Sequence, residues 1–434
     1  MTYAGTSKTC INPTFHCEMA GFIAREGYYE GIHDDLWMKS VVLQEDDSKL
    51  ILLSLDIIGL EGITINKIKD SLTHHFGVDS DSVMISTTHT HAGPATLENA
   101  NLGYVSQEYI NYIVKKATEC VNLALLDLEE VELRYGKGIC REVGKNRREV
   151  TGMTDPEVLV LSVYKANHNE LKTVVVNYAC HPTVLGPDNV QLSADFPYYL
   201  YQAIERIYED PNVLFINGAA GNINVGHHAH DSINGKSFNK RTFTEAKRHG
   251  YTLAGEVVKV IEQSESIHDF SILYKQMKMS ITFTVNDMVQ SINNELKSLK
   301  HIDKNKLKLG QQKMIQLKEK WSSIWLNNTN EDHQIHYSLS VGRIGPILFV
   351  TLPGEFFVEL GLLVKQAFPQ HPVLIFGYTN GSLGYVADQS SYIHGGYEIE
   401  EAYQAYGFPL PIPIGTGEAI IKNAVSVLKT IIRD

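Results

Sequence analysis

The segment Ser86-Thr87-Thr88-His89-Thr90-His91-Ala92-Gly93-Pro94 holds the residues of this chain best suited to metal chemistry. It follows an apolar stretch, residues 83–85, that is typical of the end of a buried strand. Alternate residues of a strand point to one face, about 6 to 7 Å apart, so His89 and His91 are expected to project together. Gly93-Pro94 then turns the chain, which places the pair at a strand end, where α/β proteins hold their sites. Two imidazoles there could form half of a metal site, or a hydrogen-bonded pair under a loop.

Two further candidates follow an apolar strand expected at residues 173–178. His181 lies just beyond it and before Pro182, a position that suits either a metal ligand or a buried histidine bonded to carbonyl groups. Asp195 lies at the start of a helix expected over residues 196–208. Its carboxylate would either cap that helix or orient a ligand imidazole from behind.

A carboxylate and a phenol come from the last third of the chain. Glu355 emerges from an apolar strand at residues 347–352 and precedes a helix expected over residues 356–368. It is therefore either an acidic residue in the first turn of that helix or a carboxylate ligand. A strand at residues 373–376 leads into a glycine-rich turn, which lets the backbone approach a site closely and brings the phenol of Tyr385 within reach.

The elements that must position these residues alternate between strand-like and helix-like segments, with hairpins between some strands. This pattern predicts an α/β protein with mixed β-sheets and flanking helices, in a single domain over residues 1–434. Residues 286–328 differ, because they are rich in Lys, Gln, Glu and Leu, with Trp321 and Trp325 four residues apart. We expect two helices there, broken near His301-Ile302-Asp303 and packed outside the sheet. They form either a solvated helical hairpin without chemistry or a lid over a lipid-binding groove.

The composition limits the class of partner. The chain has 434 residues, 43% hydrophobic and 20% charged, and its formal charge of −12 argues against nucleic acid or an anionic membrane as a partner. Its five cysteines include no Cys-x-x-Cys, and no apolar run is long enough to span a bilayer. The N-terminus lacks the apolar run of a signal peptide, so a reduced, cytoplasmic location is expected. The sequence leaves the oligomeric state open.

Five short segments of this chain match, in order, the motifs of one enzyme family. They are residues 31–37, Thr88-His89-Thr90-His91-Ala92-Gly93-Pro94, His181 after its strand, residues 353–356 and Tyr385-Val386. The corresponding motifs are Gly-Ile-His before Leu-Trp, Thr-His-Thr-His-Ser-Gly-Pro, a histidine after a central strand, Pro-Gly-Glu-Phe and Tyr-Val. The chain thereby resembles the N-terminal catalytic domain of the neutral (non-lysosomal) ceramidases, from about residue 21 to residue 407.

This resemblance implies a zinc site and its ligands. In that family zinc is held by the first histidine of the His-x-His, the later histidine, the Pro-Gly-Glu carboxylate and a tyrosine, which here are His89, His181, Glu355 and Tyr385. Such a ligand set leaves zinc an open position for water and brings the pKa of that water to about 7. His91 would donate to the developing oxyanion or transfer a proton, and its alternative role is that of a second ligand from the same strand.

The chain departs from the family at one catalytic position. Where the ceramidases carry Gly-Asp-Val-Ser-Pro-Asn, with a serine tied to catalysis, this chain has Gly221-Asn222-Ile223-Asn224-Val225-Gly226, with Asn224 at the serine position. An amide can donate to an oxyanion but cannot act as a nucleophile. Zinc-activated water is therefore the expected attacker, and a substrate other than ceramide itself is expected. We also expect no C-terminal immunoglobulin-like domain of the kind that full-length ceramidases carry, because 434 residues leave no room for it.

Two functions are compatible with these residues. The first is a zinc-dependent hydrolase that cleaves the amide bond of a small N-acylated substrate, lipid-like or not, with His91, Asn224 and Asp195 in catalysis. The second is a non-catalytic protein of the ceramidase fold that binds a metal or an acylated ligand, since the serine is missing.

A second histidine cluster comprises His227 and the His-x-His segment His228-Ala229-His230. Repeated His-x-His pairs are typical of multicopper oxidases, but the further pairs and the Cys-His ligands of such sites are missing. The cluster is therefore expected to lie in an exposed loop or at the mouth of a pocket.

Overall fold

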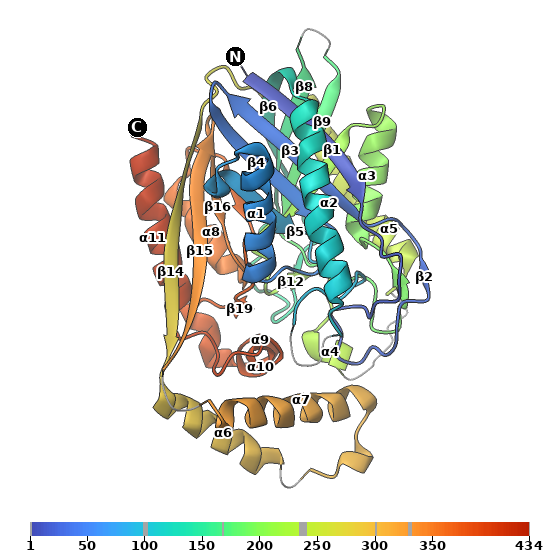
Figure 1. Cartoon of the computed structure of the whole chain (residues 1–434), viewed down its shortest axis with the longest axis vertical. Helices are drawn as coiled ribbons and strands as arrows, with labels where there is room; N and C mark the ends of the chain where they lie inside the picture. The colour runs from blue at the N-terminus through green and yellow to red at the C-terminus, as the bar shows by residue number, and fades with distance from the viewer. Residues whose placement is uncertain are drawn as a thin grey trace.

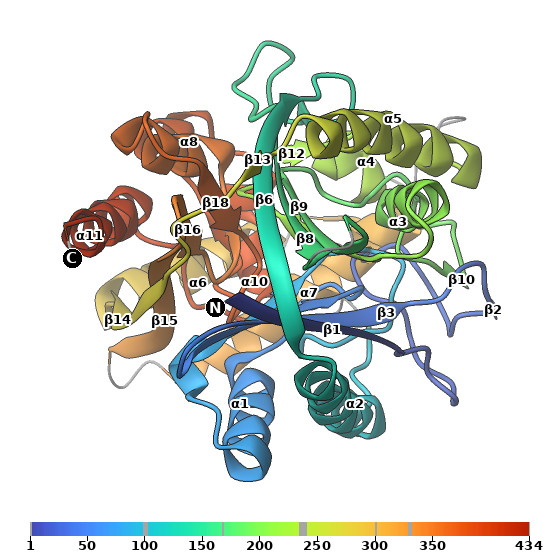
Figure 2. The ribbon, with the colours of Figure 1, turned by 90° about the horizontal axis from the view of Figure 1, so that it is seen from above.

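The computed structural model describes residues 2–98, 103–166, 169–233, 241–299, 302–328 and 332–433. Strands fill the centre of the molecule, and most helices pack around them (Figure 1, Figure 2). The strands are β1 (Thr2–Cys10), β2 (Gly31–Ile32), β3 (Trp37–Glu45), β4 (Ser48–Leu55), β5 (Val83–Thr87), β6 (Glu129–Ile139), β7 (Lys145–Asn146), β8 (Glu157–Lys165), β9 (Leu171–Tyr178), β10 (Gln191–Leu192), β11 (Asn212–Asn217), β12 (Ile223–Asn224), β13 (Glu265–Ser266), β14 (Ile272–Phe283), β15 (His333–Ile344), β16 (Ile347–Thr351), β17 (Glu355–Phe356), β18 (Val373–Phe376) and β19 (Tyr385–Val386).

The α-helices are α1 (Gly62–Phe76), α2 (Gln107–Leu126), α3 (Phe196–Ile207), α4 (Ala229–Ile233), α5 (Phe243–Glu262), α6 (Val285–Leu299), α7 (Leu309–Leu326), α8 (Val358–Ala367), α9 (Tyr397–Glu400), α10 (Ala402–Ala405) and α11 (Thr416–Ile431). Short 3-10 helices cover Ser80–Ser82, Lys304–Lys306 and Gln389–His394.

Two mixed sheets carry the architecture. The larger has the order β11-β9-β8-β6-β1-β3-β4-β5, with β13 also paired to β6. Its two ends are parallel pairs, β4 with β5 and β11 with β9, while its middle is antiparallel. The smaller sheet has the order β14-β15-β16-β18 and contains the parallel pair β16 with β18. The predicted α/β class with mixed sheets and flanking helices is confirmed.

Buried amide side chains join the ends of these sheets. Asn177 of β9 donates to the carbonyl of Ile375 in β18 (2.9 Å) and accepts from the amide of the same residue (3.1 Å). Asn380, just after β18, likewise accepts from the amide of Ile85 in β5 (3.0 Å) and donates its own backbone amide to the Ile85 carbonyl (2.9 Å). These bonds bring the carboxyl ends of the parallel strands together at one end of the molecule.

Helices close the outer faces of both sheets. Apolar residues of α1 and α2 pack on β3, β4 and β5, and those of α3 and α5 pack on β8, β9 and β11. Helices α8 and α11 pack on the smaller sheet, and a further apolar cluster fills the space between the two sheets. No described helix combines the length and the apolar character needed to cross a bilayer.

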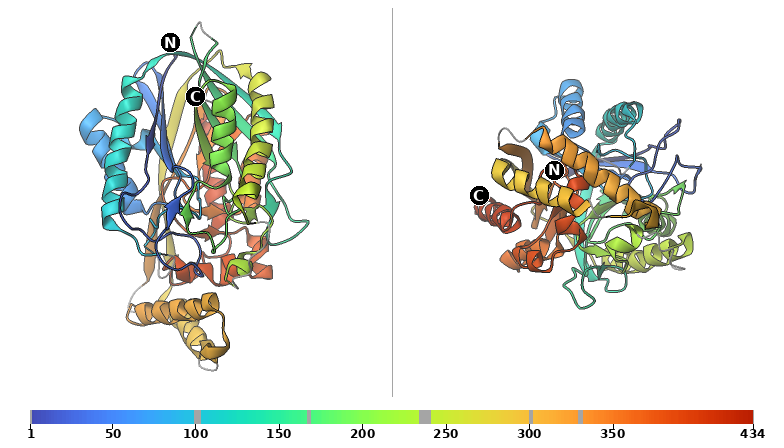
Figure 3. Two further views of the ribbon diagram at one scale, coloured as in Figure 1. Left: turned by 90° about the vertical axis from the view of Figure 1, so that its right-hand side faces the viewer. Right: turned by 90° about the horizontal axis from the view of Figure 1, so that it is seen from below.

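The helices α6 and α7 stand apart from these layers, at the end of the molecule towards which the strands β14 and β15 extend (Figure 1, Figure 3). Trp321 and Trp325 of α7 are buried against this sheet and α6, and the indole of Trp321 donates to the Phe408 carbonyl (2.7 Å). The two expected helices are therefore present and packed. The break expected near His301-Ile302-Asp303 falls between them, although Lys300 and His301 lie outside the described residues.

Two local expectations are wrong. The helix expected over residues 356–368 begins only at Val358, because Glu355 and Phe356 pair with Tyr385 and Val386 as the parallel strands β17 and β19. The strand that was expected to orient His89 and His91 ends at Thr87. His89 has a left-handed backbone with φ of 66°, so a turn of the chain, and not the alternation of a strand, sets the direction of its ring.

Candidate metal centre at the strand ends

Three histidines meet where the parallel strands end. His89 follows β5, and His181 follows β9, while His91 returns from the same turn as His89. Each histidine contributes one ring nitrogen to the cluster, and these three nitrogens all lie within 4.8 Å of one another. The rings of His89 and His181 have centroids 4.8 Å apart, and those of His89 and His91 are 4.9 Å apart.

Backbone carbonyls fix the orientation of all three imidazoles. The Nδ1 atom of His89 lies 2.6 Å from the Ile58 carbonyl, and that of His91 lies 3.0 Å from the Gly21 carbonyl. The Nδ1 atom of His181 lies 2.7 Å from the Ala220 carbonyl. A carbonyl only accepts, so each Nδ1 carries the hydrogen and each Nε2 of a neutral ring presents a lone pair. This is the arrangement that protein metal sites use to orient histidine ligands.

The carboxylate of Glu355 completes the cluster. Its Oε2 atom lies 2.8 Å from Nε2 of His181 and 3.3 Å from Nε2 of His89, and its Oε1 atom accepts from the hydroxyl of Tyr406. Burial by itself raises the pKa of Glu355, but His89 and His181 outweigh it and hold that pKa well below its usual range. Glu355 is therefore ionised at neutral pH.

These atoms are arranged so that a cation fits between them. Burial, with Arg147 adding to it, lowers the pKa of His181 to about 4, so its ring is neutral and its Nε2 lone pair faces a carboxylate. Within the described part of the chain, the Nε2 atoms of His89 and His91 are buried without a hydrogen-bond partner. Converging lone pairs and a carboxylate in a buried site are unfavourable unless a metal ion binds them, so these residues fit a divalent cation.

His91 differs from its two neighbours. His89 and His181 are buried, whereas His91 is only half-buried and lines a pocket in front of them. Its ring packs against Phe22, with centroids 5.0 Å apart, and Gly21 contacts it so closely that a Cβ on Gly21 would lie 2.4 Å from its Nδ1 atom. Burial, followed by the nearby imidazoles of His89 and His181, holds the pKa of His91 well below its ordinary value. His91 is thus a neutral imidazole at the pocket wall.

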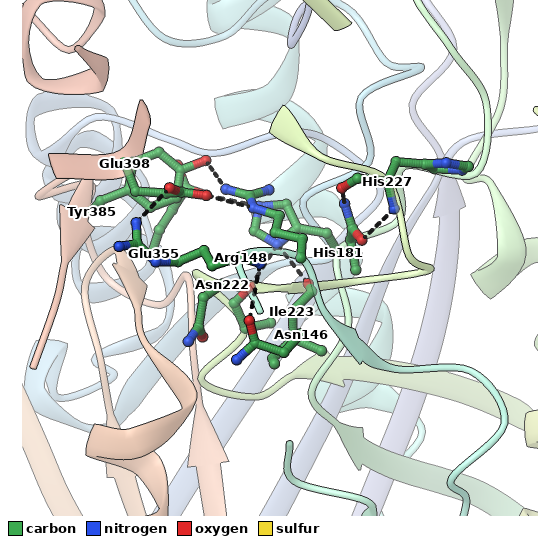
Figure 4. A network of polar contacts seen from close by, with 12 residues as sticks. Asn146, Arg148, His181, Asn222, Ile223, His227, Glu355, Tyr385 and Glu398 are labelled. Atoms are coloured by element: carbon green, nitrogen blue, oxygen red, sulfur yellow. Dashed lines mark hydrogen bonds and ion pairs between the residues drawn. The ribbon is translucent and has the colours of Figure 1, made fainter. Parts of the chain in front are cut away.

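Tyr385 lies beside Glu355 because β17 and β19 are paired in register at these two residues. Its hydroxyl accepts from the guanidinium of Arg147 (2.9 Å), and it lines the same pocket as His91. Burial raises the pKa of Tyr385 well above its ordinary value, although Arg147 opposes the change. Figure 4 shows Tyr385, Glu355 and His181 approaching one another from separate elements.

The sequence missed Arg147 and its partner Glu398. Arg147 donates through Nε to Glu398 (2.8 Å), which also receives Arg148 (2.8 Å; Figure 4). No motif marks these residues, since 251 positions separate Arg147 from Glu398. The Arg147-Arg148 pair beside the short strand β7 was the one available signal.

Two tyrosines were missed as well. The ring centroid of Tyr378 lies 4.3 Å from that of His89, and the hydroxyl of Tyr406 donates a hydrogen bond to Glu355. Tyr378 belongs to the glycine-rich turn after β18, and its left-handed φ of 53° marks it as a constrained position. The turn was a usable signal for Tyr378, while nothing near Tyr406 in the sequence marks it.

Asn224 lines the pocket and shapes the loop that follows it. Its Oδ1 atom accepts from the amides of Gly226 (2.7 Å) and His227 (3.0 Å), and its Nδ2 atom donates to the His227 carbonyl (2.8 Å). One Nδ2 hydrogen remains beyond that single bond, because an amide nitrogen carries two.

Asp195 lies apart from the cluster. Its carboxylate caps α3 by accepting from the Phe196 amide (2.6 Å) and accepts from the Leu185 amide (2.9 Å). The orienting groups of the imidazoles are backbone carbonyls, so the role of a carboxylate behind a ligand histidine does not fall to Asp195. Its capping role is the one that the geometry shows, and burial raises its pKa to about 6.

The second histidine cluster is divided. His227 and His228 line the pocket, whereas His230 lies on α4 with 52% of its side chain exposed, 3.3 Å from Glu401. Because His227 and His228 line the pocket, the cluster agrees with the second of the two expectations, a position at the mouth of a pocket.

The pocket itself is small, with a volume of about 60 Å³. Its lining combines polar residues of the site with apolar residues, among them Ile23, Ile233, Met314 and Ala405. Met314 belongs to α7, so the helical pair at residues 286–328 contributes directly to the wall of the pocket.

The fold and the site together define an α/β protein with a histidine–carboxylate centre at the carboxyl ends of its strands. Residues 4–214 match the family described as neutral/alkaline non-lysosomal ceramidase, N-terminal. A neutral ceramidase of Pseudomonas aeruginosa is 25% identical over 197 residues, which are 41% of this chain and 29% of that protein. The resemblance to the neutral ceramidases seen in the sequence is thereby confirmed over these residues.

Solved structures extend the likeness to the whole fold. The crystal structure of the neutral ceramidase from Pseudomonas aeruginosa superposes with a TM-score of 0.73 at 19% identity, over 99% of this chain and 75% of that one. A ceramidase complexed with C2 superposes with a TM-score of 0.71 at 17% identity, over 99% of this chain and 76% of that one. The sequence match spans less than a third of its curated relative. The cytoplasmic location expected from the sequence stays a prediction.

Proposed function

We propose that this protein is a zinc-dependent hydrolase that cleaves the amide bond of an N-acylated small molecule. The observation that carries the proposal is the convergence of Nε2 lone pairs and one carboxylate in a buried site, with every Nδ1 held by a backbone carbonyl. His89, His181 and Glu355 would hold the zinc, with the phenol of Tyr385 as a weaker fourth ligand. The relationship to proteins named neutral ceramidases supports the choice of an N-acyl bond.

A bound zinc ion would supply a Lewis acid for the acyl carbonyl and bring the pKa of a water molecule to about 7. In the reaction the oxygen of water joins the acyl carbon, the carbon–nitrogen bond breaks, and the departing nitrogen takes a proton. His91 faces the pocket beside the ligands, so it is placed to donate to the oxyanion or to pass that proton. The remaining Nδ2 hydrogen of Asn224 is a second candidate donor to the oxyanion.

A substrate other than ceramide belongs to the same proposal. Asn224 occupies the position of the family serine, and a pocket of about 60 Å³ gives little room for two long chains. The single domain over residues 1–434 and the lid function of residues 286–328 are likewise proposals, the second supported by Met314 at the pocket wall.

A second candidate is a protein that binds a metal or an acylated ligand without turnover. Asn224 favours it, because an amide cannot replace the chemistry of a serine hydroxyl. Metal analysis of the purified chain, together with hydrolysis of a panel of N-acyl amides before and after chelation, separates the two. We expect about one zinc per chain and hydrolysis that chelation abolishes and added zinc restores. Zinc without hydrolysis of the panel would favour the binding protein, and absence of bound metal would overturn the assignment of the metal ligands in both.

A further inference from the structure

The two carboxylate oxygens of Glu355 face different partners. Its Oε2 atom lies 2.8 Å from Nε2 of His181 and 3.3 Å from Nε2 of His89. Its Oε1 atom accepts a hydrogen bond from the hydroxyl of Tyr406, which carries its hydrogen at neutral pH. One oxygen is therefore turned towards the other candidate ligands, and the second is bound to a phenol.

The surroundings of Tyr406 fix the position of its ring. The ring stacks on Phe408, with centroids 6.3 Å apart and an interplanar angle of 18°. It also lies so close to Gly384 that a Cβ on this glycine would be 2.9 Å from its Cδ2 atom. The carbonyl of Gly384 accepts from the amide of Glu355 (2.8 Å). The same glycine thus contacts the phenol ring and the backbone of the carboxylate residue, so the two side chains are held against each other.

The ring has a further contact that leads to a candidate ligand. Tyr406 packs against an apolar cluster that includes Ile58. The carbonyl of Ile58 is the acceptor that orients the ring of His89 (2.6 Å). Tyr406 therefore packs among the groups that position two of the candidate ligands.

The occupied Oε1 atom matters because a carboxylate can bind a metal ion through one oxygen or through both. Catalytic zinc sites keep one position for water beside their protein ligands. With His89, His181 and Tyr385 as the other ligands, a second oxygen from Glu355 would compete for that position. Hydrogen bonds to a ligating side chain set its orientation at the metal, and the phenol of Tyr406 supplies such a bond.

We propose that Tyr406 restricts Glu355 to one oxygen as a metal ligand and thereby keeps a position open for water. Tyr406 is a positioning residue, since it acts through Glu355. This inference rests on the zinc site of the proposed function, but it concerns the open position and not turnover itself.

Tyr406→Phe is the variant that tests the proposal, because it removes the hydroxyl and leaves the ring on Phe408 and Gly384. Tyr109→Phe is the matched control. Tyr109 is fully buried and donates its hydroxyl to the carbonyl of Ile11 (2.8 Å), away from the metal centre. Each change leaves an acceptor without its donor, so both variants should have a lower Tm. Only Tyr406→Phe should alter the metal site.

The open position is measured with azide on the cobalt-substituted full chain, by visible absorption. We expect azide to bind Tyr406→Phe at least tenfold more weakly than wild type, because the released Oε1 atom competes with it. Metal content should stay at about one ion per chain. In the zinc-loaded protein, kcat should fall about 10- to 100-fold. Tyr109→Phe should match wild type in azide affinity and kcat. Tyr406→Met also lacks the donor and should behave as Tyr406→Phe does, which provides a second variant should the first fold poorly.

The outcomes separate this inference from the proposed function. Azide affinity and kcat equal to those of wild type in Tyr406→Phe would overturn the inference and leave the hydrolase intact. Loss of most of the metal in that variant, or no azide binding to wild type, would overturn it as well. Weaker azide binding in the variant, with no hydrolysis of N-acyl amides by wild type, would support the inference and overturn the hydrolase. A wild-type chain that binds neither zinc nor cobalt would overturn the ligand assignment and this inference with it.

Discussion

Two His-x-His segments of this chain have the same spacing, but only the first belongs to the candidate metal centre. His89-Thr90-His91 brings two rings within 4.9 Å of each other, and each Nδ1 is fixed by a backbone carbonyl. His228-Ala229-His230 lies at the start of α4, and His230 is half exposed beside Glu401. His228 precedes α4 and His230 lies on it, and neither belongs to the group of described residues whose ligand atoms meet at a candidate metal site. The backbone that carries a histidine pair, and the acceptors behind it, decide whether the pair can bind metal.

The largest difference is expected in metal content. His89→Ala and His181→Ala should lose most of the bound zinc, because each removes one of the imidazole ligands and the lone pair that it presents to the ion. His230→Ala, the matched change in the second segment, should keep about one zinc per chain. Elemental analysis after dialysis measures both. A His89→Ala variant that retained the full complement of zinc would overturn the ligand assignment.

Within the first segment, we expect the two histidines to differ from each other. His91→Gln should keep the zinc and lower kcat by about 10²- to 10⁴-fold, the range of a lost proton-transfer group. The reason is that His91 faces the pocket while Glu355 contacts only His89 and His181 among the three. Kinetics and metal analysis on the same sample give the answer. Loss of zinc in His91→Gln would make His91 a ligand, the alternative role left open by the sequence.

A smaller effect, on kcat, is expected from Asn224, which lies in β12 just before the second segment. Asn224→Asp keeps the Oδ acceptor for the amides of Gly226 and His227 and removes the Nδ2 donor. If that donor meets the oxyanion, kcat should fall about 10²-fold with the zinc content unchanged. Asn224→Ala removes the acceptor as well and should also lower the Tm. Full activity in Asn224→Asp would exclude the amide as a donor.

The smallest effect concerns His230 and pH. The hydrogen bond to Glu401 raises the pKa of His230 above its ordinary value of 6.5. A raised pKa in the folded state stabilises the protein below the unfolded pKa, and this contribution disappears as the pH rises through the folded pKa. Because the side chain is half exposed, the gain is limited to about 0.5 kcal/mol. Urea unfolding of wild type and His230→Gln should therefore differ slightly at pH 5.5 and coincide at pH 9. A difference that grew with pH would contradict the assignment.

Expectations about strands succeeded where apolar runs were long. The strand expected at residues 373–376 is β18 itself, and those at residues 173–178 and 347–352 differ from β9 and β16 by one or two residues. The role of Glu355 was harder to predict, because an acidic residue before an apolar helix is typical of the first turn of that helix. The pairing of β17 with β19, which no local pattern encodes, turned it into a strand residue facing the site.

The sequence by itself determined the fold class, the resemblance to the neutral ceramidases and the positions of the candidate histidines, because apolar periodicity and short motifs are local properties of the chain. Tertiary structure alone decided which atoms meet. Glu355 is 174 residues from His181 and 51 from Tyr406, and Arg147 is 238 from Tyr385, so their contacts depend on how strand ends converge. The carbonyls that turn each Nε2 inward are backbone atoms, which every residue has, and only the folded chain selects those of Ile58, Gly21 and Ala220.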